Sequence, residues 1–451
     1  MNKSMRAAHA AVGAALALLS GAVFAIDLVG SYHKALQVDP TRLAADEAVL
    51  AGREKAVQGR ALLLPQVSLS GSVSRIDSQS SSSLPPPLAD LIKSSGTGTV
   101  NQAALQVVQP LYDSKARSDK KQLQQQTALA EITWRQASQD LLQRVGETYF
   151  GVLLAQEGLR VAQAEKAAVA MQRDRAQARF DVGRGKVTDL QEAQARYDSV
   201  LTREVSAQST LALREAQFRE LTGVEAAGIA GLRGGFVPVA PQPDNLRAWQ
   251  ERGLANNTRV RAKQSELAIA AAEIEKYRLS GRPTLDLVAS ISHKGQNGGL
   301  SPVISPDSSR NTSIGLQLTV PLYTGGALES RLRESSARRR QAEHELGAAQ
   351  RDARLQVQDA FLAVKTGVSR VDALAQSVLS AQTALEATTL GRDLGTRTEL
   401  DVLDAQQRLF TAQLDLAQAR NDYLLGRIRL ASAAGELQEG DLGALNAYLV
   451  H

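Results

Sequence analysis

The chain has 451 residues, no cysteine and a formal net charge of +5 at pH 7. The lack of cysteine excludes disulfides, thiolate metal sites, cysteine nucleophiles and lipidation of an N-terminal cysteine. Aromatic residues make up only 4% of the chain, and Ala, Leu, Gln, Arg and Glu are abundant, which favours long helices packed side by side. Basic and acidic residues are interleaved, so they indicate solvated helix faces and no nucleic-acid partner.

Residues 1–25 have the pattern of a secretory signal peptide. Lys3 and Arg6 give a basic start, 10–23 is apolar, and small residues precede a cleavage point after Ala25. A buried helix is the alternative interpretation of this apolar stretch. No later segment reaches the roughly 18 uninterrupted apolar residues of a transmembrane helix. We therefore expect the mature protein to leave the cytoplasm without an inner-membrane anchor.

The mature sequence repeats one pattern, over 26–245 and again over 246–451. The two copies keep the same spacing between Gly183 and Gly395 as between Asp189 and Asp401. In chain order, the first copy predicts strands at about 66–76 and 99–109, a long helix at 113–181, a turn at 183–187, a helix at 188–221 and an equatorial segment at 222–245. The second predicts a helix at about 254–280, strands at 284–293 and 312–320, a long helix at 327–392, a turn at 393–397, a helix at 398–433 and an equatorial tail at 435–451. Such duplication indicates a shell built from repeated units.

The predicted strands alternate apolar and polar residues, as Val67, Leu69 and Val73 do with the serines between them. Each is close to the 9–11 residues of a tilted membrane strand, and the alternation suits a barrel with lipid outside and water inside. A half-buried soluble sheet is the alternative. Four strands cannot close a barrel around water, and open edges have no partners in a membrane, so the membrane interpretation requires an oligomer.

The long predicted helices lack proline, and at 1.5 Å per residue 113–181 would extend roughly 100 Å. The helix after Gly395 carries two apolar seams, one through Leu403, Phe410 and Leu424 and the other through Val402 and Leu409. Two seams on different flanks indicate a neighbour on each side. Repeated around a circle, this packing gives a ring of helices; an ordinary helical bundle is the alternative.

The run Gly395-Thr-Arg-Thr-Glu-Leu-Asp-Val-Leu-Asp-Ala-Gln406 resembles a signature of the TolC family of outer-membrane channel-tunnels, and a fainter copy begins at Gly183. The resemblance covers essentially the whole mature chain. It implies an α+β membrane protein: a homotrimer whose twelve-strand outer-membrane β-barrel takes four strands from each chain. The barrel would continue into a long periplasmic α-helical coiled-coil barrel.

The resemblance is strongest to the type I secretion branch of that family. It implies a passive exit duct for an unfolded protein such as an RTX toxin, with outer-membrane lipid, a periplasmic membrane-fusion adaptor and an inner-membrane ABC transporter as partners. The outer-membrane component of a multidrug efflux pump, served by a proton-driven pump, is the first alternative. A periplasmic coiled-coil adaptor or stalk is the second.

The resemblance also implies an entrance at the periplasmic end of the helical barrel. Asp401 and Asp404 are three residues apart and share a helix face, and they would form an acidic ring that favours cations. Arg397 matches the family's latch arginine, with Thr188 and Asp189 as its acceptors. Arg392 is also assigned to this latch, although the family's best-known latch has a tyrosine at its position.

Local backbone needs offer a second explanation for several of these residues. Thr188 and Thr398 each precede an acidic or amide residue with the spacing of a capping box. Gly183, Gly185 and Gly395 are turn residues that permit left-handed backbone. The sequence holds no phosphate-binding loop, GxSxG elbow or HExxH pattern, and its histidines are scattered. We therefore expect neither an enzyme nor a cofactor or metal site.

Overall fold

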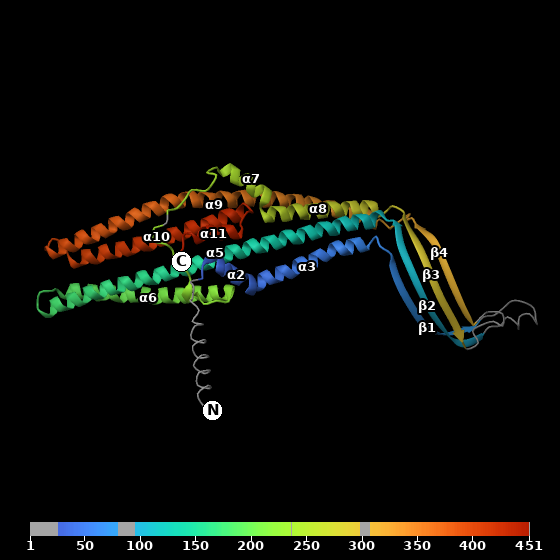
Figure 1. Ribbon diagram of the computed structural model, residues 1–451, viewed down its shortest axis with the longest axis horizontal. Helices are drawn as coiled ribbons and strands as arrows, with labels where there is room; N and C mark the ends of the chain where they lie inside the picture. The colour runs from blue at the N-terminus through green and yellow to red at the C-terminus, as the bar shows by residue number, and fades with distance from the viewer. Residues whose placement is uncertain (1–25, 80–94, 236, 298–306, 451) are drawn as a thin grey trace, which may run out of the picture. The chain divides into compact units, whose positions relative to one another are not determined.

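The computed structural model describes residues 26–79, 95–235, 237–297 and 307–450, and the expected signal peptide lies outside these ranges. The first repeat contains α2 Leu28–Val38, α3 Pro40–Ala61, β1 Gln66–Gln79, β2 Ser95–Tyr112, α5 Ser114–Asp181, α6 Val187–Thr222 and η2 Ala226–Gly228 (Figure 1). The second contains α7 Leu246–Asn256, α8 Thr258–Leu279, β3 Thr284–Asn297, β4 Ser308–Thr319, α9 Ala327–Asp393, α10 Glu399–Ala433 and α11 Glu439–Asn446. No helix in these described ranges combines the length and the apolar character needed to cross a membrane.

One predicted helix differs from the structure. The region expected to be a single helix at about 254–280 begins earlier and is divided into α7 and α8. Asn257 separates them, because its side-chain oxygen accepts hydrogen bonds from the backbone N–H groups of Arg259 (3.0 Å) and Val260 (3.2 Å). Asparagine is among the strongest N-capping residues, so the chain starts a new helix there.

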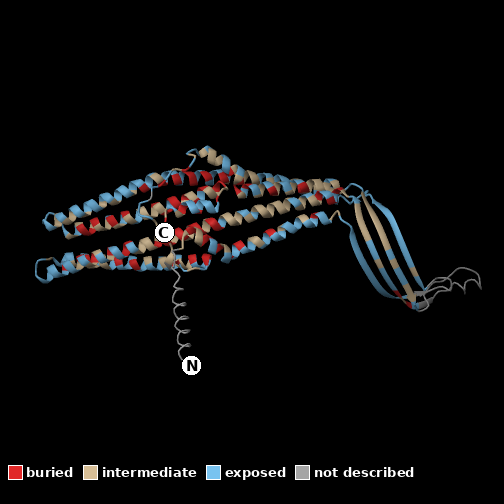
Figure 2. Ribbon diagram, in the orientation of Figure 1, coloured by how far each residue is buried: buried red, intermediate tan, exposed pale blue. Residues whose placement is uncertain are grey.

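The chain divides into two compact units, 1–47 with 133–261 and 348–451, and 48–132 with 262–347. Helices α3, α5, α8 and α9 contribute residues to both units. The first unit contains α6 and α10 with the parts of α5 and α9 that form hairpins with them, and the second contains the sheet. Buried positions are concentrated on the helices of the first unit, whereas the strands are largely exposed or intermediate (Figure 2).

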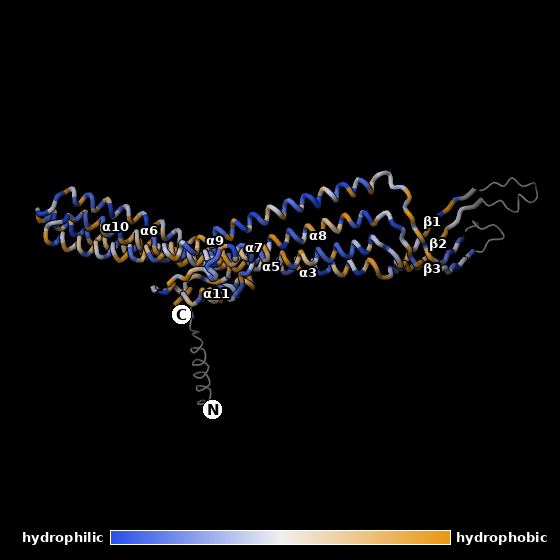
Figure 3. Tube along the Cα trace, turned by 90° about the horizontal axis from the view of Figure 1, so that it is seen from above, coloured by the Kyte–Doolittle hydropathy of each residue, from blue (hydrophilic) through white to orange (hydrophobic). Residues whose placement is uncertain are grey.

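The four strands form one antiparallel sheet in the order β1-β2-β3-β4. The two repeats meet at the β2–β3 pair, where Leu105 lies opposite Ile291. The strands are longer than predicted, and β2 continues past Pro110 with a shift in register, as expected where proline removes a ladder donor. Hydrophobic and hydrophilic residues alternate along the strands (Figure 3).

The sheet exposes its apolar row. On β1, Val67, Leu69 and Val73 are 65%, 78% and 76% exposed, and on β4 Ile314 and Leu316 are 76% and 65% exposed. Residues 66–77 are exposed at apolar and polar positions alike, so both faces of β1 are uncovered in a single chain. Within the described residues β1 and β4 each pair on one side only. The sheet therefore needs surroundings that one chain does not supply.

The core of the hairpin unit is built around aromatic side chains. Tyr149 makes edge contacts with Phe150 and Phe218, at ring-centroid distances of 5.7 and 6.2 Å. Its hydroxyl donates to the carbonyl of Ala230 at 2.8 Å, which satisfies the polar end of a fully buried ring. Tyr423 binds the backbone of Val239 in the same way, with its hydroxyl 2.9 Å from that carbonyl. These two tyrosines attach the irregular segment between the repeats to the helices.

Helix α10 is buried on two flanks. Val402, Leu409 and Tyr423 of one seam are 9% exposed or less, and Leu403 and Leu424 of the other are equally buried. Leu414 lies on the same seam as Leu403 and Leu424, here called the second seam, and is 42% exposed. The two seams read from the sequence are therefore both occupied by neighbours, although the second is covered only in part.

Candidate functional site at the hairpin turns

Both hairpins turn through the same backbone motif. In the first, the N–H of Arg184 donates to the Arg179 carbonyl (2.8 Å), and that of Gly183 to the Phe180 carbonyl (2.9 Å). In the second, Thr396 and Gly395 make the equivalent bonds to Gly391 and Arg392 (2.8 and 2.9 Å). This paired pattern is the Schellman motif, which requires left-handed backbone after the helix.

The three predicted turn glycines have two different roles. Gly183 and Gly395 have φ values of +69° and +76°, which glycine adopts without steric cost. At Gly185 the constraint is space, because a Cβ there would lie only 3.0 Å from the backbone nitrogen of Phe180. The turns are therefore fixed by backbone geometry before any role in an entrance is considered.

Asp401 caps the start of α10. Its backbone N–H donates to the Thr398 hydroxyl (3.1 Å), and its carboxylate accepts from the Thr398 N–H (2.8 Å), which together form a capping box. The bond from the Thr398 backbone, followed by that from its hydroxyl, lowers the pKa of Asp401. The exposed carboxylate therefore keeps its negative charge to a lower pH than an ordinary aspartate.

Asp404, one turn further along, has a different environment. Its carboxylate accepts from the guanidinium of Arg196 on α6 at 2.8 Å, and it is 48% exposed. The ion pair lies beside a small apolar cluster of Val169, Val200 and Leu403, one residue each from α5, α6 and α10. The two predicted ring acids thus differ, because only Asp404 is paired with a cation from the other hairpin.

Arg392 forms ion pairs within its own hairpin. Its guanidinium donates to Asp393 at 2.7 Å and to Glu399 at 3.4 Å, and the bond to Asp393 is the main cause of its raised pKa. Glu399 also accepts from Arg179 of α5 at 2.6 Å. The side chains of Arg392 and Glu399 are 11% and 10% exposed. The link to the first hairpin is therefore made by Arg179 and Glu399.

The remaining predicted latch residues are not joined within one chain. Among the described residues, no hydrogen bond or ion pair connects Arg397 with Thr188 or Asp189. Thr188 does not cap its helix, since α6 begins at Val187 with Lys186 as an N-cap that makes no side-chain bond. Asp189 lies in the first turn of α6, where an acid favours the helix dipole.

Sequence reasoning missed Arg179, Arg196 and Glu399. Each is one of many charged residues on long helices, and nothing in its local spacing indicates a partner on a distant helix. Glu399 follows the cap residue Thr398, which was the nearest available signal. The described residues contain no group of three or more histidine, aspartate or glutamate side chains arranged to hold a metal.

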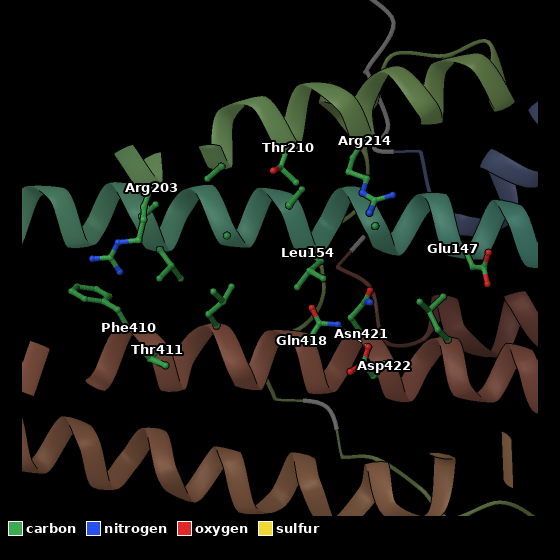
Figure 4. A pocket seen from close by; sticks show the side chains of 18 of the residues that line it. Glu147, Leu154, Arg203, Thr210, Arg214, Phe410, Thr411, Gln418, Asn421 and Asp422 are labelled. Carbon is green, nitrogen blue, oxygen red and sulfur yellow. Dashed lines mark hydrogen bonds between the residues drawn. The ribbon is translucent and has the colours of Figure 1, made fainter. Parts of the chain in front are cut away.

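A hollow of about 680 Å³ lies further along the hairpins, between α5, α6 and α10 (Figure 4). Leu154 and Phe410 form part of its wall, together with Arg203, which donates to the buried Glu165 at 2.7 Å. Asn421 is 6% exposed there, and its side-chain oxygen has no partner among the described groups. This hollow marks where the second seam of α10 is incompletely covered.

A small antiparallel sheet with exposed apolar rows, joined in sequence to two long helical hairpins, defines an outer-membrane channel protein. Residues 31–224 and 249–436 match the model of a family described as outer membrane efflux protein. The chain belongs to this family, and the predicted relationship to TolC and the outer-membrane location reaching into the periplasm are confirmed.

Individual relatives match over nearly the whole chain. The chain is 32% identical over 440 residues to outer membrane protein TolC of Vibrio cholerae, covering 97% of each. It is 32% identical over 448 residues to the alkaline protease secretion protein AprF of Pseudomonas aeruginosa, covering 97% of this chain and 90% of AprF. The crystal structure of the outer membrane protein VceC of V. cholerae shares the fold, with a TM-score of 0.75 at 20% identity, over 90% of this chain and 96% of VceC. Members of the family are channels and not enzymes.

Proposed function

We propose that three copies of this chain assemble into a passive duct, with a twelve-strand barrel in the outer membrane and a helical barrel in the periplasm. The observation that carries this proposal is the uncovered sheet. It has two edge strands, β1 and β4. Its row of apolar side chains on β1, formed by Val67, Leu69 and Val73, is 65–78% exposed. Joining β1 of one copy to β4 of the next would pair these edges, and lipid would cover the apolar row.

The duct would serve type I secretion. The 32% identity to AprF, named an alkaline protease secretion protein, supports this assignment along 97% of the chain. An ABC transporter in the inner membrane would supply energy, a periplasmic adaptor would join it to the hairpins, and an unfolded polypeptide such as an RTX toxin would be the cargo. The description of the matching family as efflux proteins favours drug efflux with a proton-driven pump as the second candidate.

The hairpin turns would form the entrance of this duct. Asp401 and Asp404 would contribute carboxylates from every copy to a ring that admits cations. Arg397 of one copy would contact Thr188 and Asp189 of a neighbour, since these residues are not joined within a single chain. An Arg–Asp contact of this kind is charge-assisted and has a defined geometry.

Conductance in a planar bilayer tests the duct and its acidic ring together. The detergent-extracted protein should give a small cation-selective conductance, and Asp401→Ala combined with Asp404→Ala should abolish the selectivity. A folded trimer without conductance would overturn the proposal. In cells, deletion should block export of one secreted protein for a type I duct, whereas hypersensitivity to several drugs with normal secretion would support the efflux alternative.

A further inference from the structure

The ion pair between Arg196 and Asp404 places a fixed positive charge beside one of the two acids of the predicted ring. Arg196 belongs to α6 of the first hairpin and Asp404 to α10 of the second, and the N–O distance is 2.8 Å. Arg196 is 27% exposed and Asp404 48% exposed. The pair is therefore partly screened by solvent, and its charges still compensate each other at short range.

Asp401 lacks this compensation. Its carboxylate accepts hydrogen bonds from the backbone and hydroxyl of Thr398, both of which are neutral donors. Arg397 acts on Asp401 only through a Coulombic effect, with no ion pair between them among the described residues. Of the two acids, Asp401 therefore presents nearly its full charge, whereas Asp404 presents a charge that Arg196 offsets.

The apolar contacts around the pair tie it to the position of the hairpins. Val169, Val200 and Leu403 form a buried cluster, and Tyr197 packs against it. The guanidinium of Arg173 lies 4.4 Å from the centre of the Tyr197 ring, within the range of a cation–π contact. Separation of α6 from α10 would uncover this cluster and break the ion pair together.

We propose that Arg196 is a specificity-determining residue of the entrance, because it neutralises Asp404 while the two hairpins are together. This inference rests on the proposed duct function. In the arrangement described here, Asp401 provides the cation selectivity. Movement of α6 away from α10 releases Asp404 and raises the negative charge of the ring, so the selectivity of the entrance depends on how far the hairpins have separated.

Reversal potentials under a salt gradient test this inference. Arg196→Gln should increase the preference of the conductance for cations by roughly twofold or more, the effect of one unit charge at about 10 Å in water. Asp404→Asn should decrease the cation preference, because it leaves Arg196 with an uncompensated positive charge. In the Asp404→Asn background, Arg196→Gln should restore the preference to about that of the wild type, because the pair as a whole carries no net charge.

Arg408 supplies a matched control. It lies on α10 one turn from Asp404, lines with Asp404 a small hollow separate from that of Figure 4, and forms no ion pair among the described residues. Arg408→Gln removes the same charge, and its effect should be equal with and without Asp404→Asn. If Arg196→Gln leaves the cation preference unchanged or reduces it, or if the double variant differs from the wild type as much as Asp404→Asn does, the inference is overturned. Arg196→Lys, which keeps the charge, should resemble the wild type and serves if the glutamine variant does not assemble. Failure of wild-type trimers to conduct would overturn the duct function itself.

Discussion

Arg179 of α5 donates to Glu399 of α10 at 2.6 Å, although 220 positions separate them in the sequence. Glu399 receives Arg392 from its own hairpin on the other carboxylate oxygen. One nearly buried acid therefore joins the turns of two hairpins through two arginines. The contact occupies the region where the family resemblance implies a latch, but Arg179 and Glu399, which join the two hairpins, are residues that the resemblance does not identify.

Glu399→Gln should loosen the two hairpin turns. The substitution leaves the largely buried Arg392 with Asp393 alone and weakens the bond to Arg179, at a cost of about 1–3 kcal/mol. The chain has no native cysteine, so spin labels at Arg184→Cys and Leu394→Cys report the distance between the turns without interference. We expect a broader and longer distance distribution in the Glu399 variant.

Glu386→Gln is the control for this measurement. Glu386 is an exposed acid of α9 that accepts from Gln382 on the same helix at 3.4 Å, so its loss should leave the distance distribution unchanged. An unchanged distribution in the Glu399 variant as well would mean that Arg179 and Glu399 do not hold the turns together. High salt should broaden the wild-type distribution only slightly, since Glu399 is shielded from solvent.

Asp401 should keep the entrance cation-selective at unusually low pH. Hydrogen bonds from Thr398 lower its pKa, so the charged form persists below the usual aspartate value of about 3.9. Selectivity should therefore be present above that value and disappear only as the pH falls through the lower pKa. Reversal potentials between pH 6 and 3 measure this dependence.

Thr398→Val removes the hydroxyl that bonds Asp401 and leaves the carboxylate in place. The pKa of Asp401 should then rise, and selectivity should be lost at a higher pH than in the wild type. If the wild type and the variant lose selectivity at the same pH, the selectivity does not depend on the charge of Asp401. The variant should also weaken the start of α10 by about 1 kcal/mol, as N-cap substitutions do.

Sequence reasoning located most accurately the elements whose ends are marked by proline or glycine. The helix expected at about 113–181 corresponds to Ser114–Asp181, between Pro110 and Gly183. Gly183 and Gly395 have the left-handed backbone predicted for them, whereas Gly185 does not. The division at Asn257 was missed because capping by asparagine competes with an otherwise continuous helical pattern. The pairs of Arg179 and Arg196 were missed for a different reason. Which charges meet between two hairpins depends on their rotation and register, which the local pattern does not specify.

Gly435 should tolerate no side chain. Its φ is +73°, and a Cβ would lie 2.2 Å from the carbonyl oxygen of Asn256. Gly435→Ala must therefore displace backbone as well as adopt a strained conformation, which alone costs about 1–3 kcal/mol. We expect a clear fall in the unfolding temperature of the detergent-solubilised protein, or failure to assemble.

Two other glycines separate these contributions. Gly395→Ala has the same left-handed strain but no atom within 4 Å of the new Cβ, and Gly440→Ala on α11 has neither problem. The loss of stability should therefore rank Gly435→Ala above Gly395→Ala, with Gly440→Ala close to the wild type. A different ranking would contradict the close approach between the segment after α10 and the end of α7.

Arg144 should stabilise the hairpin unit chiefly through Asp39. Its guanidinium makes two bonds to that carboxylate, at 3.1 and 2.7 Å, and the Asp39 side chain is only 5% exposed. Arg144→Met would leave the buried Asp39 carboxylate without its cation. We expect it to lower the free energy of unfolding by about 2–4 kcal/mol at neutral pH. Arg160→Met is the matched control on the same helix, because its partner Glu157 is three residues away and both are solvent-accessible. It should cost less than about 1 kcal/mol.

The cost of Arg144→Met should also depend on pH. The bond from Arg144 is the largest cause of the lowered pKa of Asp39. An aspartate whose pKa is lowered by folding contributes stability that is present above its unfolded pKa, about 3.9, and is lost as the pH falls through the folded value. Arg144 also lowers the pKa of Asp140, against the larger effect of burial, which raises it. Loss of Arg144 therefore destabilises the charged form of both acids, and protonation of either acid reduces the difference between wild type and variant. Unfolding temperatures measured from pH 7 to pH 2 should therefore show a gap between wild type and variant that narrows in acid. A gap that stays constant would mean that Arg144 acts through packing of its stem and not through its charge.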